Sequence, residues 1–474
     1  MVAQINRDIR IEKEYIMDDI SNKEESIVIS SGSNLSQGVD LNVDEEKMAA
    51  LRAKLAEKIK ATTEEGAKMA ENTKVMKKDK AISIGCVGSG QCGSKIVQEM
   101  YTLGYDSIAI NTNRGDLANI TLPESNKLLL EYGLGGMARD IASGKEAAEA
   151  YRDQITDLIS TQLADSQLIL LALSLGGGSG AGSAEILVDI IANTIGKALC
   201  VITVLPMDSE DAQVKSNALI TLSKLTKLSQ AGKINNLIVV DNAKIEAIYS
   251  DVGQMDFFKK ANAAIVEPLD IFNTLSAMPS DVKPLDPSEF GKLMTTSGLT
   301  VWGALTISDY SEEDSLALGV MENLNGNLLA SGFDLKQAKY AGVIFAANEK
   351  TWRGISTASV NYALATVNDQ CGTPDAVFKG VYAMSSIEDG KIMVYSIFSG
   401  LGLPDSRIND LQKEVAAFKM TTKEKDIKRN MSLNLDNGID QTISKVQEMK
   451  NKIANKNSAF NKLTNNSLID RRKK

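Results

Sequence analysis

Glycine is concentrated in one stretch of the chain that could bind phosphate. The apolar run 168–175 (LILLALSL) leads into Gly176–Gly182 (GGGSGAG), which holds five glycines in seven residues. A tight strand-to-helix turn needs only one or two glycines, so this number indicates a backbone that approaches a polyanion closely. A helix beginning near Ser183 would add the favourable dipole of its N-terminus. We predict a phosphate-binding loop here.

A second glycine motif lies earlier in the chain. Gly88–Gly93 (GSGQCG) follows an apolar run and fits the pattern GxGxxG, whose backbone N–H groups can hold phosphates. A dinucleotide fold would place an acid about 20 residues further on to bind a ribose hydroxyl. The next predicted strand ends instead in residues 111–113 (NTN), and Ser94 and Lys95 reverse the Walker order. Two such loops on one parallel sheet fit a nucleoside triphosphate better than a dinucleotide.

The side chains available for catalysis are restricted. The chain has no histidine, which excludes Ser/His and Cys/His pairs and imidazole metal sites. Its 4 cysteines are too scattered for a disulfide scaffold or a four-cysteine zinc site. Asp286 and Glu289 stand three residues apart at the start of a predicted helix, so both carboxylates can point one way. The same spacing is typical of a helix N-cap with a capping box, and the sequence alone favours that structural explanation.

The apolar runs that must position these loops describe a parallel sheet. Residues 81–87, 167–175, 198–205 and 236–241 are apolar runs separated by helical stretches, as in strands buried on both faces. Residues 253–278 are mostly apolar and predict one long helix. After it, residues 299–308, 340–347, 376–384 and 390–398 predict the strands of a second, mixed sheet.

The predicted fold class is therefore α/β. A parallel-sheet nucleotide-binding domain (81–252) is joined by a long central helix (253–278) to a smaller mixed-sheet α/β domain (279–418). Residues 1–80 form a polar extension, with an amphipathic helix expected over 44–78. Residues 419–474 form a polar, basic C-terminal tail.

Charge is segregated along the chain. Residues 81–420 carry 25 basic and 39 acidic side chains, whereas residues 421–474 carry 13 basic and 6 acidic ones. An acidic body and a basic tail suggest different partners for each, although both surfaces could simply be solvated. No run of about 18 apolar residues is present, and the first residues are too polar for a secretory signal. We expect a cytoplasmic protein that does not engage a membrane.

The two glycine motifs together resemble those of the tubulin/FtsZ superfamily of GTPases, over about residues 81–415. Within the superfamily the sequence is most similar to the TubZ-type tubulins of bacterial plasmids and phages. That similarity rests on residues 205–218 (LPMDSEDAQVKSNA), 237–245 (LIVVDNAKI), 284–290 (PLDPSEF) and 394–404 (VYSIFSGLGLP).

The resemblance implies GTP or GDP as the bound nucleotide and Mg²⁺ as its metal, without assigning the metal a protein ligand. The residues that it places on the phosphates or their metal are Gly90, Gln91, Cys92, Gly93, Asn111, Asn113, Gly177, Gly178, Ser179, Gly180 and Ala181. Gly135 and Gly136 lie where the family has a loop that senses the γ-phosphate, although the typical pattern is altered there.

The resemblance also assigns residues to the nucleoside. Pro206 and Glu210 fall in the ribose-binding loop, and Asn217 follows near the guanine or ribose. Asn242 and Asn262 match the asparagines that read the guanine edges. Phe258 matches the aromatic residue that covers the base, although an aromatic side chain on an apolar helix is usually a core residue.

The family context changes the interpretation of Asp286 and Glu289. In the family, the loop after the central helix reaches the nucleotide site of the next subunit, where its two acids position and polarise the attacking water. Pro284 stands where a family asparagine is common. A site completed by head-to-tail stacking propagates as a filament, because such a contact does not close.

The predicted function is therefore a GTPase that polymerises into dynamic filaments and segregates or positions plasmid or phage DNA. A phage spindle or cell-division filament, a non-hydrolysing structural homologue and, less favoured, an NAD-binding dehydrogenase remain alternatives. The basic tail could bind DNA phosphates, a DNA-binding adaptor protein or the acidic body of neighbouring strands. We favour the adaptor, since Phe460 is the only aromatic residue in the tail.

Overall fold

The computed structural model describes residues 80–133, 135–308, 310, 312, 314–326, 332–433, 444 and 446–452. The helix predicted over residues 44–78 lies outside the described residues, as does most of the predicted tail beyond residue 433.

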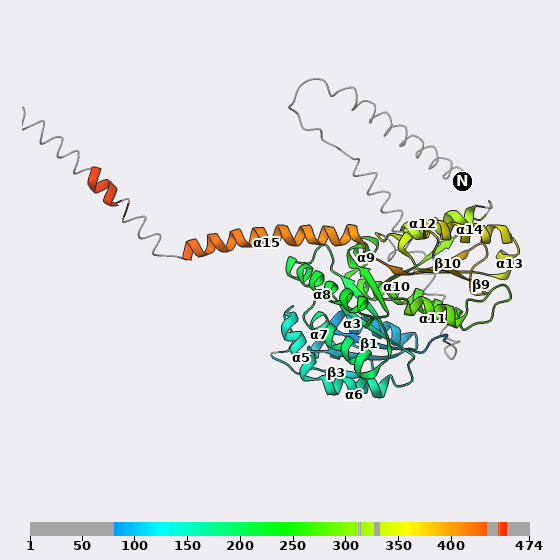
Figure 1. Ribbon diagram of the computed structural model, residues 1–474, viewed down its shortest axis with the longest axis horizontal. Coiled ribbons are helices and arrows are strands. Elements are labelled where there is room, and N and C mark those ends of the chain that lie inside the picture. Colours follow the sequence, from blue (N-terminus) through cyan, green and yellow to red (C-terminus); the bar gives the residue numbers. More distant parts are fainter. Residues whose placement is uncertain are drawn as a thin grey trace, which may run out of the picture. The chain divides into compact units, whose positions relative to one another are not determined.

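One mixed sheet organises the described residues (Figure 1). Its strands are β1 (Ile84–Ser89), β2 (Asp106–Asn111), β3 (Lys127–Leu129), β4 (Leu168–Ser174), β5 (Ala198–Leu205), β6 (Asn236–Asp241), β7 (Leu299–Ile307), β8 (Tyr340–Ala347), β9 (Ala376–Ala383) and β10 (Ile392–Leu401). Their order across the sheet is β3-β2-β1-β4-β5-β6-β7-β10-β8-β9. The strands from β3 to β7 are parallel, and β10 runs antiparallel to both β7 and β8.

The helices lie between and over these strands. They are α3 (Gly90–Thr102), α4 (Arg114–Ala118), α5 (Ile141–Ala150), α6 (Arg152–Gln162), α7 (Ser179–Asp189), α8 (Ala212–Gln230), α9 (Asn242–Ile248), α10 (Gln254–Leu275), α11 (Pro287–Thr295), α12 (Ser315–Gly326), α13 (Glu349–Trp352), α14 (Thr357–Gln370) and α15 (Asp405–Leu433). Helix α10 packs on α3, whereas α5 packs on α7 and α15 packs on α8.

The prediction of two separate sheets is wrong. Strand β7 pairs with β6 through Leu237 with Leu299 and Ile238 with Thr300, so the mixed strands continue the parallel ones. The Asn236 side-chain amide strengthens this seam by donating to Thr300 Oγ1 at 2.7 Å and to the Leu293 carbonyl at 3.1 Å. The mixed character of the C-terminal part is confirmed, since β8 and β9 are parallel beside two antiparallel pairs.

The parallel strands form the core. Every residue of β1 is buried, and β4, β5 and β6 each have a single half-buried residue at one end. Strands covered on both faces need continuous apolar sequence, which is the pattern that these runs show. Each fully buried Leu, Ile or Val side chain stabilises the fold by about 1.5–3 kcal/mol relative to an exposed one.

Helix α10 links the two halves of the sheet. It covers nearly all of the long helix predicted over residues 253–278 and keeps Pro268 in its interior. Near its C-terminal end, the Asn273 amide donates to the Ile82 carbonyl at 3.0 Å and to the Tyr105 hydroxyl at 3.1 Å. In its middle, Ile265 accepts a hydrogen bond from the Trp302 indole of β7 at 2.9 Å.

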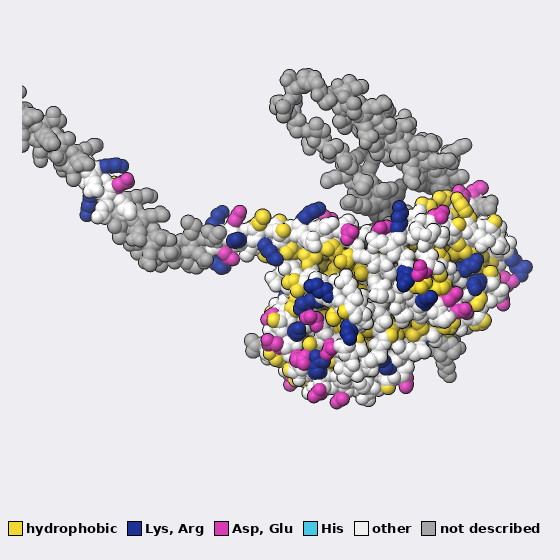
Figure 2. Space-filling view, in the orientation of Figure 1, with side chains coloured by type: hydrophobic (Ala, Val, Ile, Leu, Met, Phe, Trp, Pro, Cys, Tyr) yellow, Lys and Arg dark blue, Asp and Glu magenta, His cyan; other side chains and the backbone are white. Residues whose placement is uncertain are grey.

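Helix α15 continues into the segment predicted as a polar tail. Leu411 and Val415 are buried on one side of it, whereas residues 416–421 are all exposed. Basic and acidic side chains are interspersed along this exposed part and over the visible face of the sheet domain (Figure 2).

The crossing of α5 and α7 leaves no room for a side chain at two glycines. A Cβ added at Gly182 would lie 2.7 Å from backbone atoms of Gly144 and from the Ile141 carbonyl oxygen. A Cβ at Gly144 would overlap the carbonyl of Gly178. The position of α5 against the glycine loop therefore depends on glycine at both places.

We expect the substitution Gly182→Ala to destabilise the fold by about 1–3 kcal/mol, because only backbone shifts can accommodate the methyl group. Gly291→Ala in α11 is the matched control, since its Cβ would meet only Ile82 Cδ1, at 3.7 Å. Within a helix that substitution should be neutral or stabilise by up to about 1 kcal/mol. Urea unfolding midpoints measure both effects, and equal midpoints for the two variants would contradict the packing argument.

Candidate functional site

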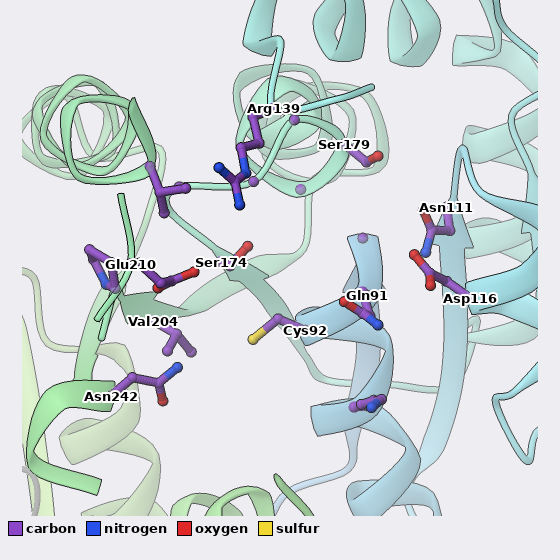
Figure 3. A pocket seen from close by; sticks show the side chains of 18 of the residues that line it. Gln91, Cys92, Asn111, Asp116, Arg139, Ser174, Ser179, Val204, Glu210 and Asn242 are labelled. Atoms are coloured by element: carbon purple, nitrogen blue, oxygen red, sulfur yellow. The ribbon is translucent and has the colours of Figure 1, made fainter. Parts of the chain in front are cut away.

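A cavity of about 770 Å³ opens at the carboxyl ends of five parallel strands. The residues that follow β1, β2, β4, β5 and β6 line it, and one face of α10 closes it. Ligands bind at this edge of parallel sheets because the strand-to-helix loops converge there. Figure 3 shows side chains from these separate segments pointing into one space.

Most residues predicted to bind nucleotide line this cavity. They are Gly90, Gln91, Cys92, Asn111, Asn113, Gly135, Gly136, Gly177, Gly178, Ser179, Gly180, Pro206, Glu210, Asn242, Phe258 and Asn262. The structure therefore brings together residues spread over more than 170 positions of the sequence. Their individual contacts with a nucleotide stay predictions.

Gly93, Ala181 and Asn217 do not line the cavity, so their predicted direct contacts lack support from the structure. A Cβ at Gly93 would overlap the Ala172 carbonyl of β4, and Ala181 is buried inside α7. Asn217 donates to the carbonyls of Arg139, at 2.8 Å, and Gly176, at 3.2 Å. These three residues support the walls of the cavity from behind.

Two helices point uncapped N-termini at the cavity. The first turns of α3 and α7 begin after Ser89 and Gly178, and neither cap residue supplies a side-chain hydrogen bond. In contrast, α4 and α9 are capped by the side chains of Asn113 and Asp241. Free N–H groups and the positive ends of two helix dipoles form a site that suits an anion.

The glycines of the second loop are explained in part by packing within the protein. A Cβ would meet the Val214 side chain at Gly176, Met137 Cβ at Gly178 (2.5 Å) and the Ser89 carbonyl at Gly180 (2.9 Å). At Gly177 a Cβ would meet a single atom, the Ser174 hydroxyl oxygen at 3.0 Å. The number of glycines thus reflects how closely other elements surround the loop, and ligand approach alone does not require all five.

The two glycine loops lie against each other. Gly90 has a φ of +71°, and a Cβ there would be 2.9 Å from the Gly180 nitrogen. The Ser89 and Ser183 hydroxyls share a hydrogen bond of 2.7 Å, and Thr112 and Ser179 share one of 2.6 Å. The three strand-end loops are therefore held in one fixed arrangement.

The other end of the cavity has the features expected of a nucleoside site. Phe258 is 42% exposed and lines the cavity, so the alternative that it is a core residue is wrong. Lys95 Nζ lies 5.5 Å from the centre of the Phe258 ring, and Phe257 packs edge-on against that ring at 5.1 Å. The Glu210 carboxylate accepts a hydrogen bond from the Met207 N–H at 2.9 Å.

The loop of residues 135–139 has strained backbone. Ala138 (φ +43°) and Arg139 (φ +69°) are non-glycine residues in the left-handed region, next to Gly135 and Gly136, which also have positive φ. Such conformations are unfavourable for residues with a Cβ and are concentrated at functional sites. Arg139 pairs with Asp211, the N-cap residue of α8, and its side chain reaches into the cavity (Figure 3).

Sequence reasoning missed three charged residues that line the cavity, namely Lys95, Asp116 and Arg139. The sequence offers a signal for Asp116, because it follows Asn113 by three residues, the spacing between an N-cap residue and the N–H that it caps. In the structure the Asn113 side chain accepts from the Asp116 N–H at 3.0 Å. Lys95 follows Gly93, the last glycine of the first loop, by two residues. No sequence feature marks Arg139, since its place depends on backbone conformation.

Asp286 and Glu289 lie outside the cavity of their own chain. Asp286 is the N-cap residue of α11, and its backbone N–H donates to the Glu289 carboxylate at 3.0 Å. Asp286 and Glu289 therefore do form the capping box that their spacing indicates. Asp286 is also exposed, so its carboxylate is available to another molecule.

Cys92 lines the cavity as a protonated thiol. Burial raises the pKa of the Cys92 thiol to about 12, and the nearby Glu210 carboxylate adds to the rise. Neither effect favours the thiolate, which is the nucleophilic form.

Among the described residues, no group of three or more Cys, Asp or Glu side chains is arranged to hold a metal ion. No helix among them has the length and apolarity to cross a bilayer.

Family models match both halves of the described sheet. Residues 83–250 match the model described as the tubulin/FtsZ family GTPase domain. Residues 271–412 match the C-terminal domain of tubulin/FtsZ-like, TubZ-like proteins. Both matches agree with the resemblance drawn from the glycine loops, and neither is to a dehydrogenase.

Individual proteins show the same likeness. A tubulin-like protein TubZ of Bacillus cereus is 24% identical over 392 residues, which cover 78% of this chain and 89% of the relative. A GTPγS-form protofilament of TubZ from Bacillus thuringiensis serovar israelensis matches the fold with a TM-score of 0.66, 19% identity and coverage of 73% and 95%. A TubZ described as a type III plasmid segregation protein matches with a TM-score of 0.62, 19% identity and coverage of 73% and 94%.

We expect Cys92 to resist alkylation. At pH 8 a thiol of pKa about 12 is ionised in about one molecule in 10⁴, against about one in four for a free cysteine. Iodoacetamide should therefore label Cys92 at least about 100-fold more slowly in the folded chain than in urea, as measured by peptide mass spectrometry. Rapid labelling of the folded chain would show that the thiolate is accessible and contradict the assignment.

Proposed function

Because the chain belongs to the tubulin/FtsZ family of GTPases and carries a TubZ-like C-terminal domain, we propose that it binds GTP and GDP in this cavity and assembles head to tail into filaments. The observation that carries the proposal is the convergence of two uncapped helix N-termini and two touching glycine loops at one end of the cavity. This arrangement offers backbone N–H groups to several phosphate oxygens at once.

The nucleotide has one orientation that suits the charges of the cavity. The phosphates lie over Gly90–Cys92 and Gly177–Gly180, and the base lies toward Phe258 and the two asparagines of α9 and α10. Glu210, fixed by the Met207 N–H, accepts from a ribose hydroxyl. Arg139 supplies positive charge to the polyphosphate. Lys95 supplies positive charge to the edge of the base.

The residues present fit a Mg²⁺ ion that arrives with the nucleotide. Mg²⁺ keeps several waters and usually binds one or two carboxylates together with substrate phosphates. Asp116 supplies a carboxylate to the phosphate end of the cavity. The buried Asn111 Nδ2 has no hydrogen-bond partner among the described residues and can donate to a phosphate or a water. When bound, the ion neutralises charge on the phosphates.

Hydrolysis requires a group that orients water, and we assign it to Asp286 and Glu289 of the next subunit. Asp286 is exposed and Glu289 half-buried at the start of α11, and neither lines the cavity of its own chain, which suits a site completed by stacking. The water oxygen bonds to the γ-phosphorus, the bond to the β–γ bridging oxygen breaks, and that oxygen keeps the electron pair. The water protons end on phosphate and solvent, so positioning and electrostatics suffice.

The identity of the cargo is the most specific part of the proposal. The structural relatives include a plasmid segregation TubZ and a TubZ protofilament, which support a cytoplasmic filament that moves plasmid or phage DNA. The basic segment 421–474 is the candidate attachment point for a DNA-binding adaptor. A phage spindle or division filament would use the same GTPase cycle, and a non-hydrolysing homologue would assemble without releasing phosphate.

We expect Asp286→Asn and Glu289→Gln to bind GTP and to assemble, but to lose at least about 100-fold in turnover. Both substitutions remove a negative charge while keeping the helix cap, because asparagine is a good N-cap residue and glutamine completes a capping box. Alanine variants at the same positions would in addition lose about 1 kcal/mol of stability. Light scattering and phosphate release, measured on the same samples, separate assembly from hydrolysis.

A mixing experiment tests whether the site is shared. Asp286→Asn subunits, with an intact cavity, are mixed with Asn262→Leu subunits, which have an intact loop but a damaged nucleoside site. In an equal mixture about one interface in four joins an intact cavity to an intact loop, so phosphate release should reappear although neither variant is active alone. Full turnover by Asp286→Asn alone would remove the catalytic assignment.

Deleting residues 434–474 should leave GTP turnover unchanged but abolish binding to the adaptor. The full chain should bind plasmid DNA only weakly at about 150 mM salt, because the seven net positive charges of residues 421–474 give a salt-sensitive phosphate affinity. Co-sedimentation with DNA, with and without the cognate adaptor, measures both. Tight binding of the full chain to DNA alone would rule out the adaptor model.

A further inference from the structure

Arg407 connects α15 to the segments that line the nucleoside end of the cavity. Its side chain is only 16% exposed and donates to the Pro206 carbonyl at 3.1 Å. The same guanidinium pairs with Asp208 at 2.9 Å and with Asp241 at 3.1 Å. Three acceptors from two strand ends therefore converge on one residue of a helix that lies about 165 to 200 positions away in the sequence.

Lys215 makes a second connection between the same elements. It lies in the first turn of α8, its side chain is 8% exposed, and it pairs with Glu414 of α15 at 2.6 Å. Its ammonium also donates to the Asp208 carbonyl at 2.8 Å. Arg407, Lys215, Asp208, Asp241 and Glu414 form one network, which we term the α15 clamp.

The α15 clamp acts on residues next to the cavity. Pro206, Met207 and Glu210 line the cavity, and the clamp holds the residues on both sides of Met207. The Met207 N–H in turn holds the Glu210 carboxylate. Asp241 directly precedes Asn242, so the clamp also fixes the start of α9.

We propose that Arg407 and Lys215 are positioning residues for guanosine binding, which hold Glu210 and Asn242 at the ribose and base without touching the nucleotide. The inference rests on the proposed function, because it takes guanine nucleotide as the ligand of the cavity. The phosphate loops are fixed mainly by packing of the backbone, and the direct contacts of the clamp are with the segments at the nucleoside end. We therefore expect the clamp to act mainly on affinity for the nucleoside.

Burial makes the α15 clamp sensitive to the loss of either cation. Burial raises the pKa of the Asp241 carboxyl, and the Arg407 guanidinium opposes that rise. Without Arg407 the half-buried carboxyl would keep the Ala243 N–H but lose its ion pair with the guanidinium, which is unfavourable. The loop 206–208 would then relax toward solvent and carry Glu210 with it.

Linkage gives the α15 clamp a second consequence. Coupling between two binding events is reciprocal, so whatever seats or lifts α15 changes nucleotide affinity, and nucleotide changes the seating of α15 by the same factor. Helix α15 leads directly into the basic segment assigned to cargo attachment. Cargo that pulls on this helix would therefore alter nucleotide affinity through Arg407 and Lys215.

The test measures affinities of the full chain for GTP, GDP and 2′-deoxy- and 3′-deoxy-GTP below the assembly concentration. Arg407→Met keeps the stem of the side chain and removes the guanidinium, and Lys215→Met does the same for the second cation. Leu411→Ala is the matched control, because Leu411 is fully buried on the same helix but belongs to no polar contact of the clamp. Urea unfolding reports the stability of each variant.

We expect Arg407→Met and Lys215→Met to weaken GTP and GDP equally, by about 3- to 30-fold. Wild-type protein should lose affinity for the deoxy nucleotide that lacks the hydroxyl bound by Glu210, and this loss should shrink in both variants. Arg407→Lys should recover part of the affinity, since an ammonium can reach some of the acceptors. Leu411→Ala should lower the unfolding midpoint yet keep affinity within about twofold and the deoxy discrimination unchanged.

Three results would overturn the inference. Unchanged affinity in both methionine variants would show that the clamp does not position the loop. An equal loss in Leu411→Ala would show a general effect of α15 packing. A loss confined to GTP would place the effect on the phosphates. If wild-type protein binds no guanine nucleotide, the proposed function itself fails, and that outcome is visible before any variant is made.

Discussion

The structure depends on backbone-to-backbone contact at the carboxyl edge of the sheet. Gly93 of α3 packs on the Ala172 carbonyl of β4, and Gly90 packs on Gly180. A single methyl group would push α3 away from β4 at the first contact and away from α7 at the second. Because nothing larger than hydrogen lies between them, α3 and α7 bring their N-termini to one point. The anion site is a consequence of that packing.

Local sequence predicted this part of the molecule well. The buried strands were evident as apolar runs, and the loops after them had to meet at one edge because the strands are parallel. Glycines 176–182 and 88–93 were therefore placed together correctly. The reason given for the second loop was incomplete, since Gly178 and Gly182 are glycine to admit the 137–140 loop and α5. A pattern identified the loop, but only the packing explains its composition.

The parts that were not predicted depend on contacts between segments that are distant in sequence. The continuity of the sheet rests on two residue pairs between β6 and β7, which are about 60 positions apart in the sequence. Arg139 reaches the cavity because of its left-handed backbone, and Arg407 reaches Pro206 across 201 positions. Sequence patterns of period two or 3.6 report burial, but they cannot report which charged side chains meet.

Different interactions consequently fix the two ends of the cavity. Close backbone contacts fix the phosphate end in one conformation. It can therefore discriminate between ligands, but its conformation changes little when a ligand binds. The loops at 135–139 and 206–211 are held by side-chain ion pairs, which can exchange partners. These loops meet at Asp211, which pairs with Arg139 and caps α8, and α8 carries Lys215 to Glu414 of α15. A change at the strained loop can therefore reach α15 through two ion pairs that the first turn of α8 joins. In a chain without histidine, carboxylate pairs with arginine and lysine are the groups left to carry such a response.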